Sequence, residues 1–161
     1  MLRSKWLAAM LTAGLMLPAL ADDDENEGLE HLQLPQVSNK NWKAECASCH
    51  MAYPPGMLPA SSWSRMMKGL DQHYGTDASL DPAMVRQISV WLEAHAGTYK
   101  RVREAPPQDR ITQSAWFERK HRDIEPAVWK RAPIGSRANC MACHTRADQG
   151  DFDDDRVRIP K

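Results

Sequence analysis

Two short segments of this chain share one pattern, Cys-x-x-Cys-His, and together they contain all four of its cysteines. They occupy residues 46–50 and 140–144. Two thiols at this spacing can form thioether bonds to the vinyl groups along one edge of a porphyrin, and the histidine that follows can ligate the iron. We therefore predict two covalently bound haem c groups. The attachment residues are then Cys46, Cys49, His50, Cys140, Cys143 and His144.

The cysteines allow three other interpretations. A four-cysteine zinc ribbon separates its two pairs by about 15–20 residues, whereas 90 residues lie between Cys49 and Cys140. A thioredoxin-like dithiol needs a strand-helix-strand pattern, and neither pair is surrounded by one. Two disulfides would suit an oxidising compartment. None of these alternatives requires a histidine directly after each second cysteine.

Residues 1–21 have the composition of an export signal. Arg3 and Lys5 give a positive start, an apolar stretch follows, and Ala19 and Ala21 form an A-x-A cleavage site. An uncleaved membrane anchor is the alternative, but 15 apolar residues are short for a span of about 20. We expect a periplasmic mature chain that begins near residue 22 and has no membrane span.

Charge is distributed unevenly along the chain. Residues 100–146 carry 11 basic and five acidic side chains, a net charge of +6, although the whole chain is neutral. Such a region can steer an acidic protein partner. The other interpretation, which we favour, is that these side chains neutralise haem propionates or solvate the surface. We expect redox partner proteins and no nucleic acid.

No segment shows the alternation typical of strands, so we expect a mainly α fold of two small haem-binding modules. The expected domains are residues 22–99 and 113–161, joined by a linker at 100–112. Each domain is marginal in length for a hydrophobic core of its own. A buried porphyrin would supply the missing apolar surface, and the chain without haem should fold poorly.

Four helices are expected. A short helix over 38–46 leads into the first motif, and an extended loop at 51–59 follows it, because three prolines and a glycine forbid a long helix there. The second helix is capped by Ser61 or Ser62 and ends near Gly75. The third begins at Asp81 and Pro82 and ends at Gly97. A fourth spans 114–124, and apolar side chains are available to hold down the charged tail 151–161, namely Phe152, Val157 and Ile159.

The sixth ligand of each iron decides the chemistry, because a second histidine closes the site and a vacancy allows ligand binding. His31 lies in a polar stretch. His73 and His95 both share a helical face with apolar residues, so both remain candidates for the first haem, with His73 favoured. For the second haem we favour His121, which shares a face with Phe117. Methionine ligands are also conceivable, although such residues more often fill a core; they are Met57, Met66, Met67 and Met84.

Longer stretches of the sequence resemble a known family, the soluble dihaem cytochromes c of Gram-negative bacteria. The similar stretches are residues 49–60, 73–82, 111–112, 116–117, 120–122, 139–145 and 158–160. The resemblance covers nearly the whole mature chain and implies a class I cytochrome c-like first domain and a less usual, irregular helical second one. It also implies bis-histidine ligation, by His50 with His73 and by His144 with His121.

The resemblance further implies a periplasmic electron carrier of low potential and not an enzyme. A small oxygen-binding monohaem cytochrome is then the expected acceptor, and a membrane cytochrome b is a plausible donor. The alternative is a dihaem enzyme or gas-ligand sensor, such as a small peroxidase, in which one haem keeps an open position.

Overall fold

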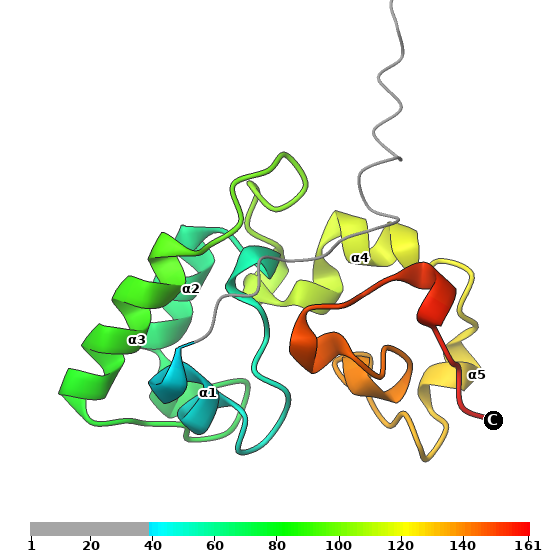
Figure 1. The fold of residues 1–161 in the computed structure, drawn as a ribbon, viewed down its shortest axis with the longest axis horizontal. Helices are drawn as coiled ribbons and strands as arrows, with labels where there is room; N and C mark the ends of the chain where they lie inside the picture. The colour runs from blue at the N-terminus through cyan, green and yellow to red at the C-terminus, as the bar shows by residue number, and fades with distance from the viewer. Residues whose placement is uncertain (1–38) are drawn as a thin grey trace, which may run out of the picture.

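The computed structural model describes residues 39–161, and the expected signal peptide and His31 lie outside this range. Figure 1 shows the described chain as two halves side by side, with α1, α2 and α3 in one and α4, α5 and the C-terminal tail in the other. The helices are α1 (Lys40–Cys46), α2 (Ala60–Lys68), α3 (Pro82–Ala94), α4 (Ala115–Lys120) and α5 (Pro126–Trp129), with seven short 3₁₀ turns between and after them. No strand occurs in this range, so the expected mainly α fold is confirmed.

The first half is built around the faces of α1, α2 and α3. Asn39 caps α1 by accepting hydrogen bonds from the backbone N–H groups of Asn41 and Trp42. Trp42 then packs against Trp91 of α3, with ring centroids 4.9 Å apart. Ile88 and Leu92 of α3 are fully buried in the same core. Burial of such apolar side chains is the main stabilising contribution in a domain of this size.

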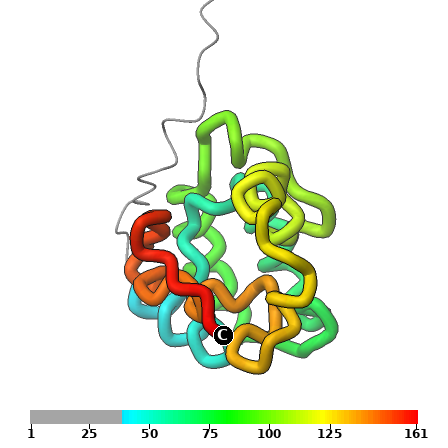
Figure 2. The backbone as a smooth tube through the Cα atoms, turned by 90° about the vertical axis from the view of Figure 1, so that its right-hand side faces the viewer, coloured from blue at the N-terminus to red at the C-terminus, as the bar shows by residue number. Residues whose placement is uncertain are grey.

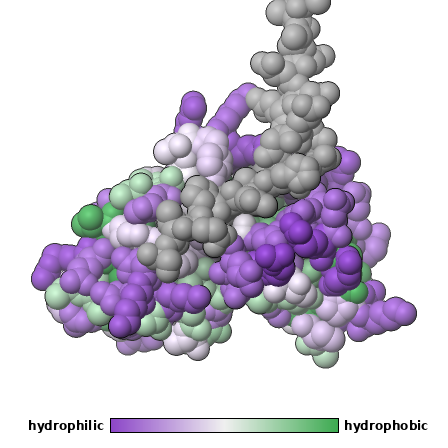
Figure 3. All heavy atoms as spheres, viewed as in Figure 1, coloured by the Kyte–Doolittle hydropathy of each residue, from purple (hydrophilic) through white to green (hydrophobic). Residues whose placement is uncertain are grey.

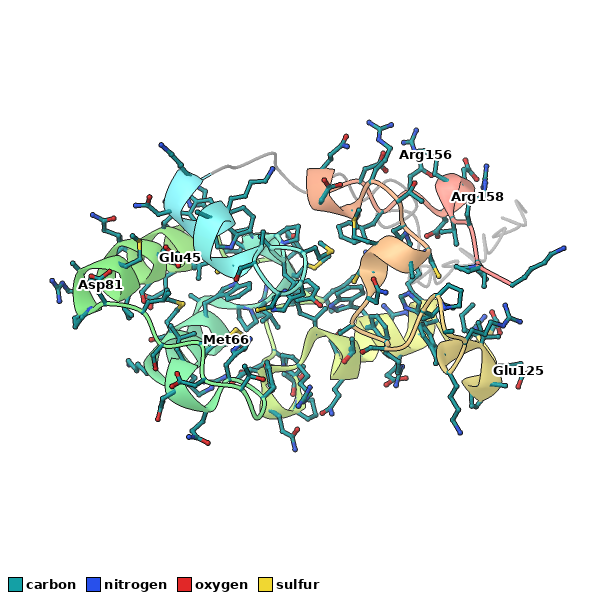
Figure 4. All side chains as sticks on the ribbon, turned by 90° about the horizontal axis from the view of Figure 1, so that it is seen from below. Glu45, Met66, Asp81, Glu125, Arg156 and Arg158 are labelled. Carbon is teal, nitrogen blue, oxygen red and sulfur yellow. The ribbon has the colours of Figure 1, made fainter. Side chains whose placement is uncertain are left out.

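The predicted third helix is confirmed at its start, where Asp81 caps it and Pro82 occupies its first turn. Asp81 lies at the outer end of α3 in Figure 4. The helix ends at Ala94, with His95 as its C-cap, before the predicted stop at Gly97. Gly97 instead donates its N–H to the carbonyl of Leu58 at 2.9 Å.

The second predicted helix is wrong at both ends. It begins at Ala60, after Pro59, and neither Ser61 nor Ser62 caps it; Ser62 is fully buried inside the helix. It ends at Lys68, because Gly69 leaves the helical conformation. A 3₁₀ turn (Leu70–Gln72) follows. His73 therefore lies on a turn and not on the helical face that periodicity predicted.

The second half has less regular structure. The helix predicted over 114–124 begins near its predicted start, with Ser114 as the N-cap of α4, but it ends at Lys120 and not at residue 124. After Lys120 the backbone hydrogen bonds join residues that are three apart, as in a 3₁₀ turn. One example is the N–H of Ile124, which donates to the carbonyl of His121. Pro126, the first residue of α5, disfavours the helical conformation only at the residue before it, Glu125. It therefore does not explain why α4 already ends at Lys120.

The C-terminal tail crosses the second half, where it is drawn in red in Figure 2. The N–H of Arg158 donates to the carbonyl of Cys143 at 3.0 Å, and Lys120 pairs with Asp154 at 3.0 Å. Phe152 packs against the core of the first half. These contacts fix the tail onto the second half, next to the second motif. The apolar residues of the tail had led us to expect that it is held down.

The surface in Figure 3 is mostly hydrophilic, with small scattered apolar patches. Within the described residues, no helix combines the length and apolar character that a membrane span needs.

Candidate haem sites

The first motif lies at the end of α1. Cys46 is the last residue of the helix, and Cys49 and His50 follow on the turn after it. The Nδ1 atom of His50 is 2.7 Å from the carbonyl oxygen of Met51. Such a bond fixes the tautomer and leaves Nε2 free to ligate a metal.

His73 lies opposite His50 across a gap of defined width. The two ring centroids are 6.2 Å apart and the ring planes differ by 26°. A metal–imidazole bond is about 2.0–2.1 Å long and the ring centroid lies about 1.1 Å beyond the nitrogen, so imidazoles on opposite sides of one metal have centroids roughly 6.3 Å apart. The observed separation has room for one metal ion between the rings.

The second motif has the same spacing in a different local fold. Cys140 opens a 3₁₀ turn, and Cys143 and His144 follow it. His121, the C-cap of α4, lies 6.2 Å from His144 between ring centroids, with the planes 74° apart. The ring of His121 stacks on Phe117 at 4.0 Å, and its Nδ1 is 2.9 Å from the carbonyl of Phe117. The end of α4 thus holds His121 in a fixed orientation.

His95, the rival of His73, lies elsewhere. It is exposed at the end of α3, with its Nδ1 2.8 Å from the carbonyl of Trp91. The methionine alternatives belong to the core of the first half: Met57 and Met67 are buried in it, and Met66 and Met84 pack against it.

A cavity of about 240 Å³ adjoins the second histidine pair. His121, His144, Cys140 and Cys143 all line it, and most of the other lining side chains are apolar. These include Ile111, Ile124, Val128, Trp129, Ile134, Phe152, Val157 and Ile159, with Met57 reaching it from the first half. The cavity is therefore an apolar space with thiols and imidazoles at its wall, as a porphyrin requires.

Two polar atoms of the cavity wall support the same fit. The Nε1–H of Trp116 and the Nε–H of Arg137 are buried and have no hydrogen-bond partner among residues 39–161. Buried donors are normally paired, so such exceptions indicate a missing partner. Haem carries two propionate carboxylates, which can accept from both groups. The residues present therefore fit the predicted cofactor.

Burial also sets the protonation of the site. It lowers the pKa of His73, His121 and His144, which favours the neutral imidazole that binds metals. Burial raises the pKa of the Cys46 and Cys140 thiols to about 11. None of the four thiols is in a disulfide.

The structure therefore brings together the predicted pairs His50 with His73 and His121 with His144. It also identifies site residues that sequence reasoning missed. They are Trp116 and Arg137 at the second site and Tyr53 at the first, where the ring of Tyr53 lies 4.9 Å from that of His50. Trp116 lies within a stretch similar to the known family, which could have drawn attention to it. Nothing distinguished Arg137 from the other basic residues of its region, because its role depends on one buried atom.

Comparison with known proteins supports this description. The sequence profile of the family described as DHC, dihaem cytochrome c, matches residues 42–152. Two solved structures from Rhodobacter sphaeroides are similar, one described as DHC and the other as a diheme cytochrome c. They share 42% and 40% identity, with TM-scores of 0.63 and 0.64, and each match covers 72% of this chain and 98% of the other.

A third solved structure, of a diheme cytochrome type c from Shewanella baltica OS155, is also similar. It shares 40% identity with a TM-score of 0.67, over 76% of this chain and 93% of that one. No curated protein sequence matched the chain.

Proposed function

Since the chain belongs to the dihaem cytochrome c family and carries two covalently bound haem c groups, we propose that it transfers electrons in the periplasm at low potential. The haems supply the redox chemistry, in which each iron gains or loses one electron. The protein supplies the axial ligands, an apolar enclosure and the surface that partners meet.

The observation that carries this proposal is the separation of 6.2 Å between the rings of each histidine pair. We assign His50 with His73 to the first iron and His144 with His121 to the second. Two imidazoles would ligate each iron, and such ligation would leave no position open to a substrate. Bis-histidine ligation also gives a lower reduction potential than ligation by histidine and methionine.

The bonds behind the ligands support a low potential as well. His50 and His121 each have Nδ1 within hydrogen-bond distance of a backbone carbonyl, that of Met51 and that of Phe117. An imidazole that donates in this way is more basic at Nε2. A more basic ligand stabilises ferric over ferrous iron, which lowers the potential.

The partners and the location rest on the sequence. A cleaved signal over 1–21 would deliver the chain to the periplasm, where a membrane cytochrome b is the proposed donor. A small monohaem cytochrome is the proposed acceptor. The basic region 100–146 offers a surface for an acidic partner.

Electron paramagnetic resonance of the oxidised holoprotein tests the ligation directly. The g values of low-spin ferric haem depend on the angle between the imidazole planes, because parallel planes split the iron d orbitals more than perpendicular planes do. With angles of 26° and 74°, we expect two different low-spin signals of equal intensity and no high-spin signal. Carbon monoxide should bind the reduced protein slowly. A high-spin signal, or rapid binding of one carbon monoxide per chain, would instead favour the dihaem enzyme or gas sensor.

A further inference from the structure

Three residues of the described chain that are not glycine have a positive φ, and all three belong to one cluster beside His73. They are Tyr74 at 51°, Gln108 at 55° and Asp109 at 56°. Positive φ is uncommon for such residues and most costly for bulky ones. Strained residues persist where surrounding contacts hold them, and they concentrate at functional sites.

His73 is the first residue of a tight turn. The N–H of Thr76 donates to the carbonyl of His73 at 3.0 Å, and the central residues Tyr74 and Gly75 have φ of 51° and 95°. Two positive φ values define a type I′ turn, which normally has asparagine and glycine at its centre. A tyrosine is therefore an unfavourable residue at position 74 unless its side chain has a separate role.

The side chain of Tyr74 reaches the segment between the two halves. Its hydroxyl donates to the carbonyl of Gln108 at 3.2 Å and to that of Asp109 at 3.1 Å. These are the two other residues with a positive φ. The guanidinium carbon of Arg110 lies 4.1 Å above its ring, a favourable cation–π distance. The bond of this hydroxyl thus ties the turn of His73 to residues 108–110.

Asp109 is in turn fixed to α2. Arg65 donates to both of its carboxylate oxygens, from Nε at 2.9 Å and from the terminal nitrogen at 2.6 Å. The same terminal nitrogen lies 3.4 Å from the hydroxyl of buried Ser62. A bidentate arginine–carboxylate pair is geometrically specific. Arg65, Tyr74 and Asp109 therefore form a continuous link, which we name the clasp, from a core helix to the turn of His73.

We propose that the clasp positions His73 as the distal ligand of the first haem. Without it, the turn would be free to carry His73 away from the iron. His121 needs no such device, because the end of α4 and Phe117 hold it directly. Arg65, Tyr74 and Asp109 are positioning residues, since they act through His73. This inference rests on the proposed ligation by His73.

Cyanide binding to the oxidised holoprotein measures how often a distal histidine leaves the iron. Tyr74→Phe removes the hydroxyl and keeps the ring. Tyr74→Asn removes the link but suits the turn, so it separates the clasp from backbone strain. We expect each variant to bind one cyanide per chain about five- to tenfold faster than the parent, as the loss of a hydrogen bond predicts.

Tyr99→Phe is the matched control. Tyr99 is 42% exposed, as Tyr74 is, and its hydroxyl donates to one carbonyl, that of Gly56, at 3.0 Å. This variant should keep the parental rate within about twofold. Parental rates in both Tyr74 variants, or an equal acceleration in Tyr99→Phe, would overturn the clasp.

His73→Ala separates this failure from failure of the proposed ligation. If His73→Ala gives one high-spin haem that binds cyanide at once while the Tyr74 variants behave as the parent, only the clasp is wrong. If His73→Ala stays fully low spin and slow, His73 is not the ligand and both proposals fall.

Discussion

The hydroxyl of Tyr53 donates a hydrogen bond of 2.6 Å to the carbonyl of Ala138. Tyr53 follows the first haem motif by three residues, and its ring lies 4.9 Å from that of His50. Ala138 precedes the second motif by two residues, and its carbonyl also accepts from the N–H of Cys140. One side chain therefore joins the surroundings of both sites, so the two halves are fixed to each other next to the cofactors.

Tyr53→Phe should lower the free energy of unfolding of the holoprotein by about 1 kcal/mol, the net contribution of one hydrogen bond. The ring and its contact with His50 remain, so both haem spectra should persist. Denaturant unfolding followed at the haem bands measures the change. Because the bond joins the halves, the variant should also change the difference between the two haem potentials.

The control for Tyr53→Phe is again Tyr99→Phe, whose hydroxyl bond lies within the first half. It should cost a similar amount of stability and leave the potential difference unchanged. Equal effects of the two variants on the potentials would show that Tyr53 has no special place between the sites.

Much of this arrangement was readable from the sequence, because local chemistry determines it. The spacing of each motif determines how two thiols and an imidazole lie relative to one another. Asp81 and Pro82 favour the start of a helix through local interactions alone. The position of His73 was not readable in this way. Gly69 ends α2 and a strained turn follows, so a histidine predicted on a helical face lies on a loop.

The clasp could not be predicted for a related reason. Arg65 and Asp109 are 44 residues apart in the chain, and no periodicity relates them. The unpaired nitrogen of Arg137 is likewise a property of three-dimensional packing. Sequence patterns identify residues whose partners are close to them in the chain. The partners of Arg65, Asp109 and Arg137 are distant in the chain and become neighbours only in the folded protein.

Histidine substitutions should distinguish the ligands from their rival. His73→Ala and His121→Ala should each open one iron, convert about half of the haem absorption to high spin and raise the potential of that haem. His95→Ala should leave both low-spin signals intact, because His95 is exposed and bonded to its own helix. Visible and magnetic resonance spectra measure all three. A low-spin signal lost in His95→Ala would reverse the assignment.

Gly97→Ala should destabilise the first half by about 1–3 kcal/mol, as overpacking does. A Cβ at this position would lie 2.4 Å from the carbonyl oxygen of Gly56 and 2.4 Å from a methyl of Val102. The backbone oxygen cannot move without displacing the loop that follows the first motif. Thermal unfolding of the holoprotein measures the loss.

Gly69→Ala is the matched control for Gly97→Ala. Its nearest atom would be the carbonyl oxygen of Arg65 at 3.6 Å, an ordinary contact, and its φ of −118° suits any residue. Stability should therefore be unchanged or slightly increased. An equal loss in both variants would mean that the close approach at Gly97 is not the cause.

The pH dependence of stability should contain a contribution from Asp109. The hydrogen bond from Arg65 holds the pKa of this carboxyl below its usual value of 3.8. A depressed folded-state pKa gives a stabilisation that is present above the unfolded-state pKa and is lost as the pH falls through the folded-state value. Asp109→Asn should therefore melt below the parent at neutral pH, and the difference should shrink as the pH falls below the ordinary carboxyl pKa of 3.8.

Arg65→Gln provides the test of cause for this pH effect. In that background, Asp109→Asn should have little effect on the melting temperature at any pH, because the partner is already gone. A pH-dependent difference that survives without Arg65 would assign the effect to another group.

The basic region should influence the rate at which an acceptor is reduced. Arg119 and Arg122 of this region are exposed on either side of His121. Reduction of an anionic acceptor such as ferricyanide should slow as ionic strength rises from about 0.01 M to about 0.15 M, because the screening length falls from about 30 Å to about 8 Å. A cationic acceptor should not be slowed.

Substitution of basic residues in each half tests from which surface electrons pass to the acceptor. Arg119→Gln with Arg122→Gln should reduce both the rate at low salt and its salt dependence. Arg86→Gln removes one charge from an exposed position on α3 of the first half and should have the smaller effect. Stopped-flow measurement of the second-order rate constant compares them. If Arg86→Gln has the larger effect, electrons leave from the first haem and the basic region serves only to solvate the protein.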